Sequence, residues 1–360
     1  MSARRVSDAS WDWRLWGAAA ALGLISAVAM SSAAVTVSPT LASRHGLWIL
    51  IGCGMSLAVA RTNYRQWLDA APVLFGLSVA ALGLVELVGP TRLGAQRWLS
   101  FFGFSLQPSE LAKLSTILLL SRALAGQPSP LPSRAFWGSL LIMGVPAVLI
   151  FLQPDLGSAS ILGAIWLGMA WVAGASRRDL GTLAVALVIL APIGWHVLKD
   201  YQRDRLMVFL DPQADPLGAG YTIIQSTIAI GSGRLLGRGW RAGTQNQLSF
   251  LPEHHSDFIF SVVGEEWGFF GCLLTIAAFA VLLARIGRLV LDVADPQGRL
   301  LAAGIMAWIG YQAFVNMGMV MGVLPVVGVP LPLISYGGSS MVVLWLGLGL
   351  LQSVRRIALQ

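Results

Sequence analysis

The sequence predicts an all-α integral membrane protein, a polytopic bundle of about ten transmembrane helices, and three observations support this prediction. Hydrophobic residues make up 56% of the 360 residues and charged residues only 11%, whereas a soluble domain has about 25% charged residues. The mean hydropathy is +0.72. Apolar runs of about 20 residues, the length that crosses a bilayer core, recur along the chain.

Ten apolar segments are long enough, or nearly so, to cross the membrane. They are predicted at residues 13–35, 46–60, 68–88, 107–124, 135–152, 156–175, 180–198, 258–284, 299–323 and 339–354. The first is longer than the apolar core of a signal peptide, so we expect it to remain as a helix. The second is short for a span, and the fifth and sixth are joined by a very tight turn at residues 153–155.

The positions of the arginines predict the orientation of these spans. If the N-terminus is inside, fourteen arginines fall in cytoplasmic segments, among them Arg4 and Arg5. Only Arg44, Arg92 and Arg97 fall in the short outer loops. Basic residues of short loops stay on the cytoplasmic side of a membrane, so we expect both termini in the cytoplasm.

Two irregular segments are predicted at the outer face. Residues 199–257 form a long loop between the seventh and eighth spans, and loops of this length are usually functional. Within it, residues 221–230 are apolar but too short to span, which predicts an interfacial or re-entrant helix against the bundle. Residues 231–243 are rich in glycine and arginine, which can hold anionic groups. Residues 324–340 contain three prolines and adjacent glycines, and such backbone near membrane depth must line a cavity or be buried.

Composition excludes several classes of function. The net charge of +7 comes from arginines in breaks between apolar runs, so no nucleic-acid partner is expected. Cys53 and Cys272 lie inside apolar segments and provide neither a disulfide framework nor metal-ligand spacing. No Walker loop, dinucleotide fingerprint or Ser-His-Asp order is present. We expect one membrane domain over residues 1–360 and no soluble domain.

Asp257 is the candidate catalytic residue. It stands between the long loop and the eighth span, in LPEHHSDFIF, where an aspartate can cap the helix by accepting backbone N–H bonds. It can also be a general base that faces a cavity, with Glu253, His254 and His255 close by. Desolvation raises the pKa of such a carboxyl group and nearby arginines lower it, which suits proton abstraction from a sugar hydroxyl. The two roles are compatible, and both stay open.

Glu110 and Lys113, in QPSELAK, are three residues apart and therefore share one face of the fourth span. Pro108 suits the first turn of a helix, which places the pair about one turn from the outer end. Ionisable residues inside a membrane are costly and normally face the bundle interior. The pair is either a structural ion pair between helices or the polar floor of a cavity that binds a charged head group.

The remaining candidates are expected to bind substrate at the same outer face. Arg97 and Trp98 are either an interfacial pair or a phosphate contact. Asp155 either caps the sixth span or belongs to the site. Arg203 and Arg205 lie in the long loop, either as solvated charge or as binding residues. The other candidate side chains are Gln107, His255 and Arg44.

Six stretches of the chain resemble the SEDS family (shape, elongation, division and sporulation), and within it the members that serve elongation. They are GAQRWLSFFGFSLQPSELAK (94–113), QPDLGS (153–158), RDRLMVFLDPQADPLGAGYTIIQS (203–226), AIGSGRLLGRG (229–239), GTQNQLSFLPEHHSDFIFSVVGEEWGFFG (243–271) and LPLISYGGSS (331–340). Together they are very specific and cover most of the chain in the family's order. The departures are Arg234 for a second glycine, Arg238 for a common lysine, and serine for threonine at Ser158 and Ser256.

The resemblance implies a peptidoglycan glycosyltransferase that polymerises lipid II at the outer face of the bacterial cytoplasmic membrane. It also implies a class B penicillin-binding protein, a transpeptidase, as partner. Asp257 matches the family's essential aspartate. Glu110, Lys113 and Arg97 match its polar cavity residues. Arg203 and Arg205 fall in its basic loop motif.

From that reaction we expect one inverting displacement in which Asp257 takes the proton of the acceptor 4-hydroxyl. No cofactor is firmly predicted; arginines of the loop, with or without a divalent cation (Mg²⁺ or Mn²⁺), would stabilise the departing pyrophosphate. One alternative is a lipid II flippase, which would need Glu110 and Lys113 and tolerate loss of Asp257, although the sequence has no paired broken helices of the transporter kind. The other is a non-catalytic scaffold for the penicillin-binding protein, which would tolerate loss of every polar cavity residue. Membrane lipids are the remaining expected partner.

Overall fold

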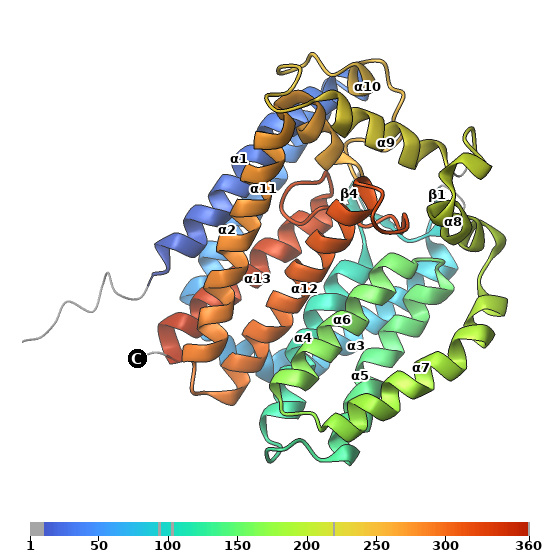
Figure 1. Ribbon diagram of the computed structural model, residues 1–360. Helices are drawn as coiled ribbons and strands as arrows, with labels where there is room; N and C mark the ends of the chain where they lie inside the picture. The colour runs from blue at the N-terminus through green and yellow to red at the C-terminus, as the bar shows by residue number, and fades with distance from the viewer. Residues whose placement is uncertain (1–10, 93–94, 102–103, 219, 359–360) are drawn as a thin grey trace, which may run out of the picture.

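The computed structural model describes residues 11–92, 95–101, 104–218 and 220–358, and within them each of the ten predicted spans is a helix (Figure 1). The ten helices are α1 (Trp13–Ala33), α2 (Leu41–Arg61), α3 (Tyr64–Val88), α4 (Pro108–Ala125), α5 (Ser133–Leu152), α6 (Leu156–Val172), α7 (Arg177–Val197), α11 (Ile259–Asp292), α12 (Pro296–Val320) and α13 (Gly338–Ala358). Helix α1 begins and α13 ends at the same end of the bundle (Figure 1). Arg4 and Arg5, expected in the cytoplasm, lie outside the described residues.

The prediction was least accurate at the helix boundaries. Helix α2 begins at Leu41, five residues before the predicted start, and its 21 residues are long enough to cross a membrane. Helix α11 continues to Asp292 and has 34 residues. Within the described residues, seven helices are both long enough and apolar enough to cross a membrane, namely α1, α3, α5, α7, α11, α12 and α13. Helix α6, with 17 residues, is slightly shorter than these helices. Helix α4 has 18 residues but is less apolar, because it includes Glu110, Lys113 and Arg122.

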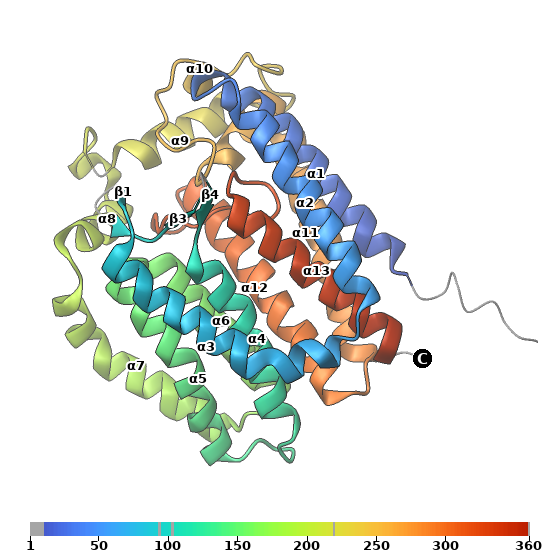
Figure 2. The ribbon, with the colours of Figure 1, turned by 180° about the vertical axis from the view of Figure 1, so that it is seen from behind.

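Helix α12 lies at the centre of the bundle. It packs against α4, α6, α11 and α13, while α1 packs on α11, α2 on α13, α3 on α4 and α5 on α6 (Figures 1 and 2). The most apolar stretches of α12 and α13 are 67% buried, against 22% for α3 and α5, so the core follows α12 and α13. Helix α7 lies apart from the bundle, and Asp179 is its only buried residue (Figure 1).

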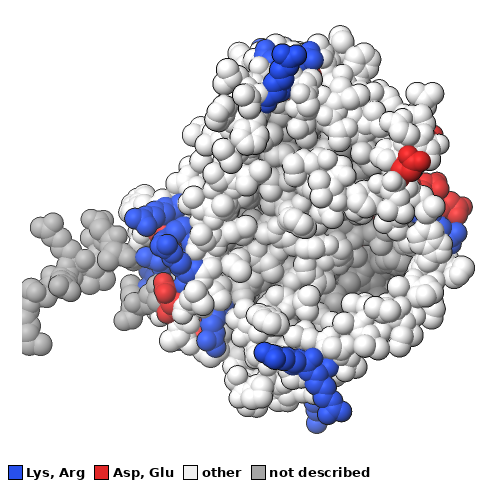
Figure 3. All heavy atoms as spheres, in the orientation of Figure 1, with Lys and Arg blue, Asp and Glu red and all other residues white. Residues whose placement is uncertain are grey.

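Charged side chains are absent from the middle of the face that Figure 3 shows, as expected for a surface covered by lipid. Lys and Arg gather instead toward the ends, and the face is hollowed on the side where α7 lies. At the end where α1 begins, the Asp12 carboxylate caps α1 and binds Arg285 at 2.8 Å and Arg355 at 3.4 Å. This cluster joins α1, α11 and α13.

Helix α11 is broken at Gly268, whose φ of +66° and ψ of −157° leave the helical region. The loop at residues 233–239 completes the interrupted hydrogen-bond ladder: Arg238 N–H donates to Glu265 O at 2.9 Å, and Phe269 N–H donates to Arg234 O at 2.8 Å. The expectation that this glycine-rich loop holds anions is therefore wrong for the N–H groups of Arg238 and Gly239, because they already donate to Glu265 O and Glu266 O of α11.

The outer face is built from the connections between spans. Between α3 and α4, two antiparallel hairpins join β1 (Thr91–Arg92) to β2 (Ala95–Gln96) and β3 (Leu99–Phe101) to β4 (Phe104–Leu106); the sequence interpretation missed both. The long loop contains α8 (Asp200–Leu210), α9 (Tyr221–Ser232), α10 (Thr244–Gln247) and a 3₁₀ turn (Pro212–Ala214), and a second 3₁₀ turn follows α1 (Ala34–Thr36). Helix α9 packs on α11 and α12, as predicted for residues 221–230. Residues 321–337 are non-helical, in agreement with the second irregular segment.

Candidate active site

Asp257 lies in a turn at residues 253–257 that precedes α11. The turn forms because the backbone N–H groups of Ser256 and Asp257 both donate to Glu253 O at 3.1 Å, with Glu253 at a φ of +50°. The N-cap of α11 is Phe258, and no side chain caps that helix. Asp257 is therefore not the helix cap, and within the described residues its partly buried carboxylate accepts no hydrogen bond.

Three successive carbonyl groups hold this turn in place. His255 O accepts a bond from Tyr336 N–H at 3.0 Å. Ser256 O accepts one from the Ser335 hydroxyl at 2.5 Å. Asp257 O accepts one from the Asn316 amide at 2.8 Å. The irregular segment before α13, with help from α12, therefore anchors the backbone on which Asp257 stands.

The charges around Asp257 suit a base. Burial and the Glu253 carboxylate raise the pKa of Asp257 to about 6, against the opposing influence of Arg205 and Arg97, while Asp155 raises it further. A carboxyl group with this pKa is mostly ionised at neutral pH and is still a useful proton acceptor.

Gly328 separates the Asp257 carboxylate from the Arg205 guanidinium. Its φ is +68°, and a β-carbon at this position would lie 3.3 Å from Asp257 Oδ2 and 3.8 Å from Arg205 Nη1. The two charged groups thus approach each other across a residue without a side chain. Arg205 is exposed on α8.

Arg97 and Asp155 meet at the tight turn between α5 and α6. Arg97 Nε donates to Gln153 O at 3.1 Å, and its Nη2 donates to Pro154 O. Asp155 caps α6, since its Oδ1 accepts the Ser158 N–H at 3.0 Å. Both residues have structural roles, and both act electrostatically on Asp257.

Glu110 and Lys113 form a buried ion pair, with Lys113 Nζ 2.8 Å from Glu110 Oε1. Lys113 Nζ also donates to Gln312 Oε1 at 3.4 Å and lies 5.2 Å from the ring centre of Trp308. Gln312 in turn donates to Pro330 O at 2.8 Å. The ion pair is therefore linked through α12 to the irregular segment beside Asp257.

The other predicted residues are placed around this centre with different neighbours. The Arg203 guanidinium donates to Trp195 O and His196 O at 2.9 Å each, so it holds the end of α7. Burial lowers the pKa of His255, whose ring lies 6.0 Å from that of Tyr336. The candidates with no side-chain role beside Asp257 among the contacts described are Gln107, whose backbone N–H donates to the Ser339 hydroxyl, the partly buried Trp98 and the exposed Arg44.

Sequence reasoning missed Gln312 and Asn316. Both lie in the ninth predicted span and are fully buried. The signal was available, because two amide side chains four residues apart in an apolar span share a face and need partners inside the protein.

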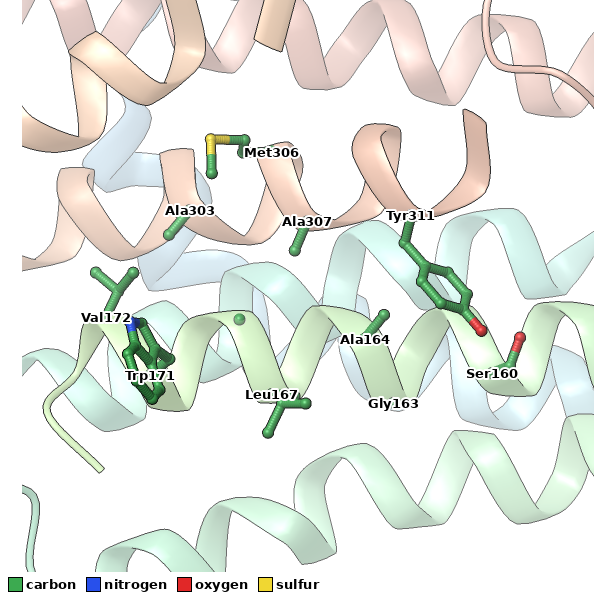
Figure 4. A pocket seen from close by; sticks show the side chains of 11 residues that line it. Ser160, Gly163, Ala164, Leu167, Trp171, Val172, Ala303, Met306, Ala307 and Tyr311 are labelled. Atoms are coloured by element: carbon green, nitrogen blue, oxygen red, sulfur yellow. The ribbon is translucent and has the colours of Figure 1, made fainter. Parts of the chain in front are cut away.

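An apolar groove of about 600 Å³ runs between α6 and α12 (Figure 4). Small residues line its length, among them Gly163, Ala164 and Ala307. The hydroxyl groups of Ser160 and Tyr311 lie at one end, which is the end nearer the start of α6, and Trp171 lies at the other (Figure 4). The polar end of the groove therefore points toward the turn that carries Asp155.

Metal-ligating groups are sparse in the described parts of the chain. No group of three or more His, Cys, Asp or Glu side chains there could hold a metal ion. The carboxylates around Asp257 are separate from one another and form no such cluster among the described residues.

The sequence matches a known protein family over nearly its whole length. A family model described as cell cycle protein, covering FtsW, RodA and SpoVE, matches residues 10–359. The chain is 42% identical to the peptidoglycan glycosyltransferase MrdB of Escherichia coli K12 over 308 residues, 85% of this chain and 83% of that protein. It is 40% identical to the probable peptidoglycan glycosyltransferase FtsW of Geobacter metallireducens over 316 residues, 86% and 84% of the two chains.

Two solved structures are similar over nearly the whole chain. One is a chain of a peptidoglycan synthase complex that coordinates polymerization and crosslinking, with a TM-score of 0.83 and 33% identity over 97% of this chain and 99% of that chain. The other is the rod shape determining protein RodA of Thermus thermophilus, with a TM-score of 0.73 and 30% identity over 97% and 98%.

Proposed function

The chain belongs to the SEDS family of peptidoglycan glycosyltransferases, and from this premise we propose that it polymerises lipid II into β-1,4 glycan strands during cell elongation. The observation that supports this most directly is Asp257, a carboxylate with a pKa of about 6 on an anchored turn beside Arg205. Such a group can take a proton from a sugar hydroxyl near neutral pH.

The proposed reaction is a single inverting displacement. The 4-hydroxyl oxygen of the acceptor N-acetylglucosamine attacks C1 of the donor sugar, and the bond from C1 to the pyrophosphate oxygen breaks. Asp257 takes the hydroxyl proton as the new β-linkage forms. The undecaprenyl pyrophosphate leaves with the bonding electrons, so the α-linked donor gives a β-linked product without a covalent enzyme intermediate.

Arg205 is the proposed pyrophosphate-binding residue. Its guanidinium lies across Gly328 from Asp257, where charge develops on the leaving group. Arg97 contributes positive charge to the same region while it holds the turn before α6. A divalent cation bound with the substrate would add to this stabilisation, but no step requires one.

Glu110 and Lys113 form the proposed floor of the site. Both are buried, and Lys113 is bonded to Glu110 and Gln312. We propose that the pair supports the irregular segment through Gln312 and Pro330, so that loss of the pair weakens substrate positioning rather than the proton transfer.

The groove between α6 and α12 is the proposed site for the hydrocarbon chain of the lipid substrate. It is apolar, it lies within the span, and its polar end faces the Asp155 turn near the proposed base. A β-carbon at Gly163 would meet no atom within 4 Å, so the backbone has room for a side chain here, and Gly163→Leu would place that side chain in the groove. This substitution should raise the KM for lipid II; an unchanged KM would contradict the assignment.

The proposed orientation places the Asp257 end of the bundle outside the cytoplasmic membrane and both termini inside. Leu217, which is 89% exposed in the long loop, and Leu291, which is 84% exposed near the opposite end, test this. A cysteine at Leu217 should react with a membrane-impermeant thiol reagent in whole cells, and one at Leu291 should not. The reverse pattern would overturn the orientation.

The decisive experiment uses the full chain purified with a class B penicillin-binding protein, the proposed partner. Lipid II is supplied in detergent, and glycan products are resolved on a gel. We expect polymer from the wild type and from Asp204→Asn, an exposed control on α8, and none from Asp257→Asn. Polymer from Asp257→Asn would refute the base assignment. Absence of polymer from folded, partner-bound wild type would favour the flippase or scaffold, which a vesicle translocation assay separates.

A further inference from the structure

Helix α12 carries a buried polar row toward the proposed base. Trp308, Gln312 and Asn316 follow at intervals of four residues, which places them on one face of the helix. All three have 0% exposed surface. The Trp308 indole donates to Gln312 Oε1 at 2.8 Å, and Gln312 accepts from Lys113, so this row connects the buried ion pair to the outer face.

Asn316 uses its amide group entirely as a donor to backbone. Its Nδ2 lies 2.8 Å from Asp257 O and 2.6 Å from Val329 O. Because an amide nitrogen has two protons and a carbonyl oxygen can only accept, these two partners fix which way the amide points. Within the described part of the chain, Asn316 Oδ1 is buried without a partner. Among the described residues, the side chain therefore donates two hydrogen bonds while its own oxygen accepts none.

The two backbone groups that Asn316 binds belong to the two segments that meet at Asp257. One belongs to the residue that supplies the proposed base, and the other belongs to Val329, next to Gly328, across which the Asp257 carboxylate faces Arg205. Of the three bonds that anchor the turn, this one alone comes from a membrane-spanning helix. Asn316 thus ties the backbone of Asp257 to the segment that contains Gly328.

We propose that Asn316 is a positioning residue for the glycosyl transfer, an inference that rests on the function proposed above. Its amide holds Asp257 and the 328–329 backbone in the register that brings carboxylate, acceptor hydroxyl and Arg205 together. A displacement of about 1 Å at a reacting group can cost about 100-fold in rate. Loss of the amide should therefore lower kcat and leave ground-state binding of lipid II unchanged.

The test compares Asn316→Leu with Ser226→Ala. Leucine has a similar size and no donor. Ser226 is an equally buried control, whose hydroxyl donates to α12 at Val320 O, 2.6 Å away and one turn beyond Asn316. Both variants lose buried hydrogen bonds to the same region, but only one of them touches the turn that holds Asp257. Initial polymerisation rates are measured against lipid II concentration for the partner-bound complex, together with the thermal unfolding temperature.

We expect Asn316→Leu to lower kcat by about 100-fold with KM within about twofold, and Ser226→Ala to keep kcat within about twofold at a comparable loss of thermal stability. If Asn316→Leu keeps wild-type kcat, or changes KM instead, the inference is wrong. Should the leucine variant not fold, Asn316→Ser, whose hydroxyl is too short to reach both carbonyl groups, decides by the same criteria. Asp257→Asn is measured alongside. Its retained activity would overturn the proposed function itself, whereas an inactive Asp257→Asn with a fully active Asn316→Leu would overturn the positioning role alone.

Discussion

Asp257→Asn should make the protein more stable while it makes the enzyme inactive. Burial and the Glu253 carboxylate raise the pKa of Asp257 from 3.8 to about 6, so the folded state binds this proton more tightly than the unfolded state does. Holding Asp257 ionised in the folded protein therefore costs free energy. Asparagine has a similar shape and no charge, so the substitution removes that cost.

The magnitude and its pH window follow from linkage. The rise in the pKa of Asp257 from 3.8 to about 6 corresponds to a cost of about 3 kcal/mol at pH values above 6. The cost is absent below about pH 4, where Asp257 is protonated in both states, and it grows as the pH rises from about 4 to 6. Asp257→Asn should thus match the wild type in stability at low pH and exceed it by up to about 3 kcal/mol at pH 7.5.

The assay is thermal unfolding of the detergent-purified chain at pH 4.5 and pH 7.5. For a chain of this size we expect an increase in Tm of about 5 °C for Asp257→Asn at the higher pH. Asp295→Asn is the control of opposite sign, because that carboxylate accepts bonds from the Tyr64 hydroxyl at 2.6 Å and Gly298 N–H at 2.8 Å. Its loss should cost about 1–3 kcal/mol. If Asp257→Asn is less stable than the wild type at pH 7.5, or its gain does not depend on pH, the account of Asp257 as a costly buried charge is refuted.

The other predictions concern the same centre. Initial polymerisation rates should fall about tenfold per pH unit below about pH 6, because Asp257 must be ionised to act as a base; a rate that is flat down to pH 5 would contradict this. Lys113→Ala should lower stability by about 3–5 kcal/mol because it leaves Glu110 buried and uncompensated. The double variant Glu110→Gln with Lys113→Met should lose less in the same melting assay, and an equal loss would argue against a charge effect. Gly328→Ala should lower kcat at least tenfold, since its methyl group would meet the Asp257 carboxylate, whereas Gly322→Ala, with a similar φ of +72°, should strain the backbone and keep kcat.

The spans could be predicted because hydropathy is a property of whole segments. Ten apolar runs gave ten helices, and the errors fell at their ends, where polar residues reach the interface. The predicted start of α2 was five residues too late, because the exposed polar residues Ser43 and Arg44 lie in its first turns and interrupt the apolar run. The hairpins before α4 were missed because strands of two or three residues leave almost no period in a sequence.

The site was predictable only as far as single residues reveal it. Asp257 stood out as a carboxylate at the edge of a span, and the structure places it on an anchored turn near Arg205. Arg203 and Arg205 belong to one motif and looked equivalent, but a separation of two residues on α8 directs them to different faces. Arg203 holds the end of α7, and only Arg205 approaches Asp257.

The glycine-rich loop shows a different limit. Its glycines and arginines suggested a site for anions, whereas two of its N–H groups, those of Arg238 and Gly239, donate to α11 beside the break at Gly268. Glycine is common in membrane helices, so a single glycine in an apolar run does not signal a break. Asn316 was missed for a related reason, since its partners, Asp257 and Val329, are distant in the chain and become neighbours only through the fold.

Helix α7 has an evolutionary consequence. It has no buried side chain apart from Asp179, and it is held at its two ends, by the Ser176 cap and by the bonds from Arg203. Selection can therefore act on its length and its termini but has little hold on the identity of the apolar residues between them. Among relatives, the residues in the middle of α7 should therefore exchange freely for other apolar residues, while the residues at its ends stay the same. The helix acts as a spacer between the two sides of the membrane, and its length is the property that the rest of the protein requires.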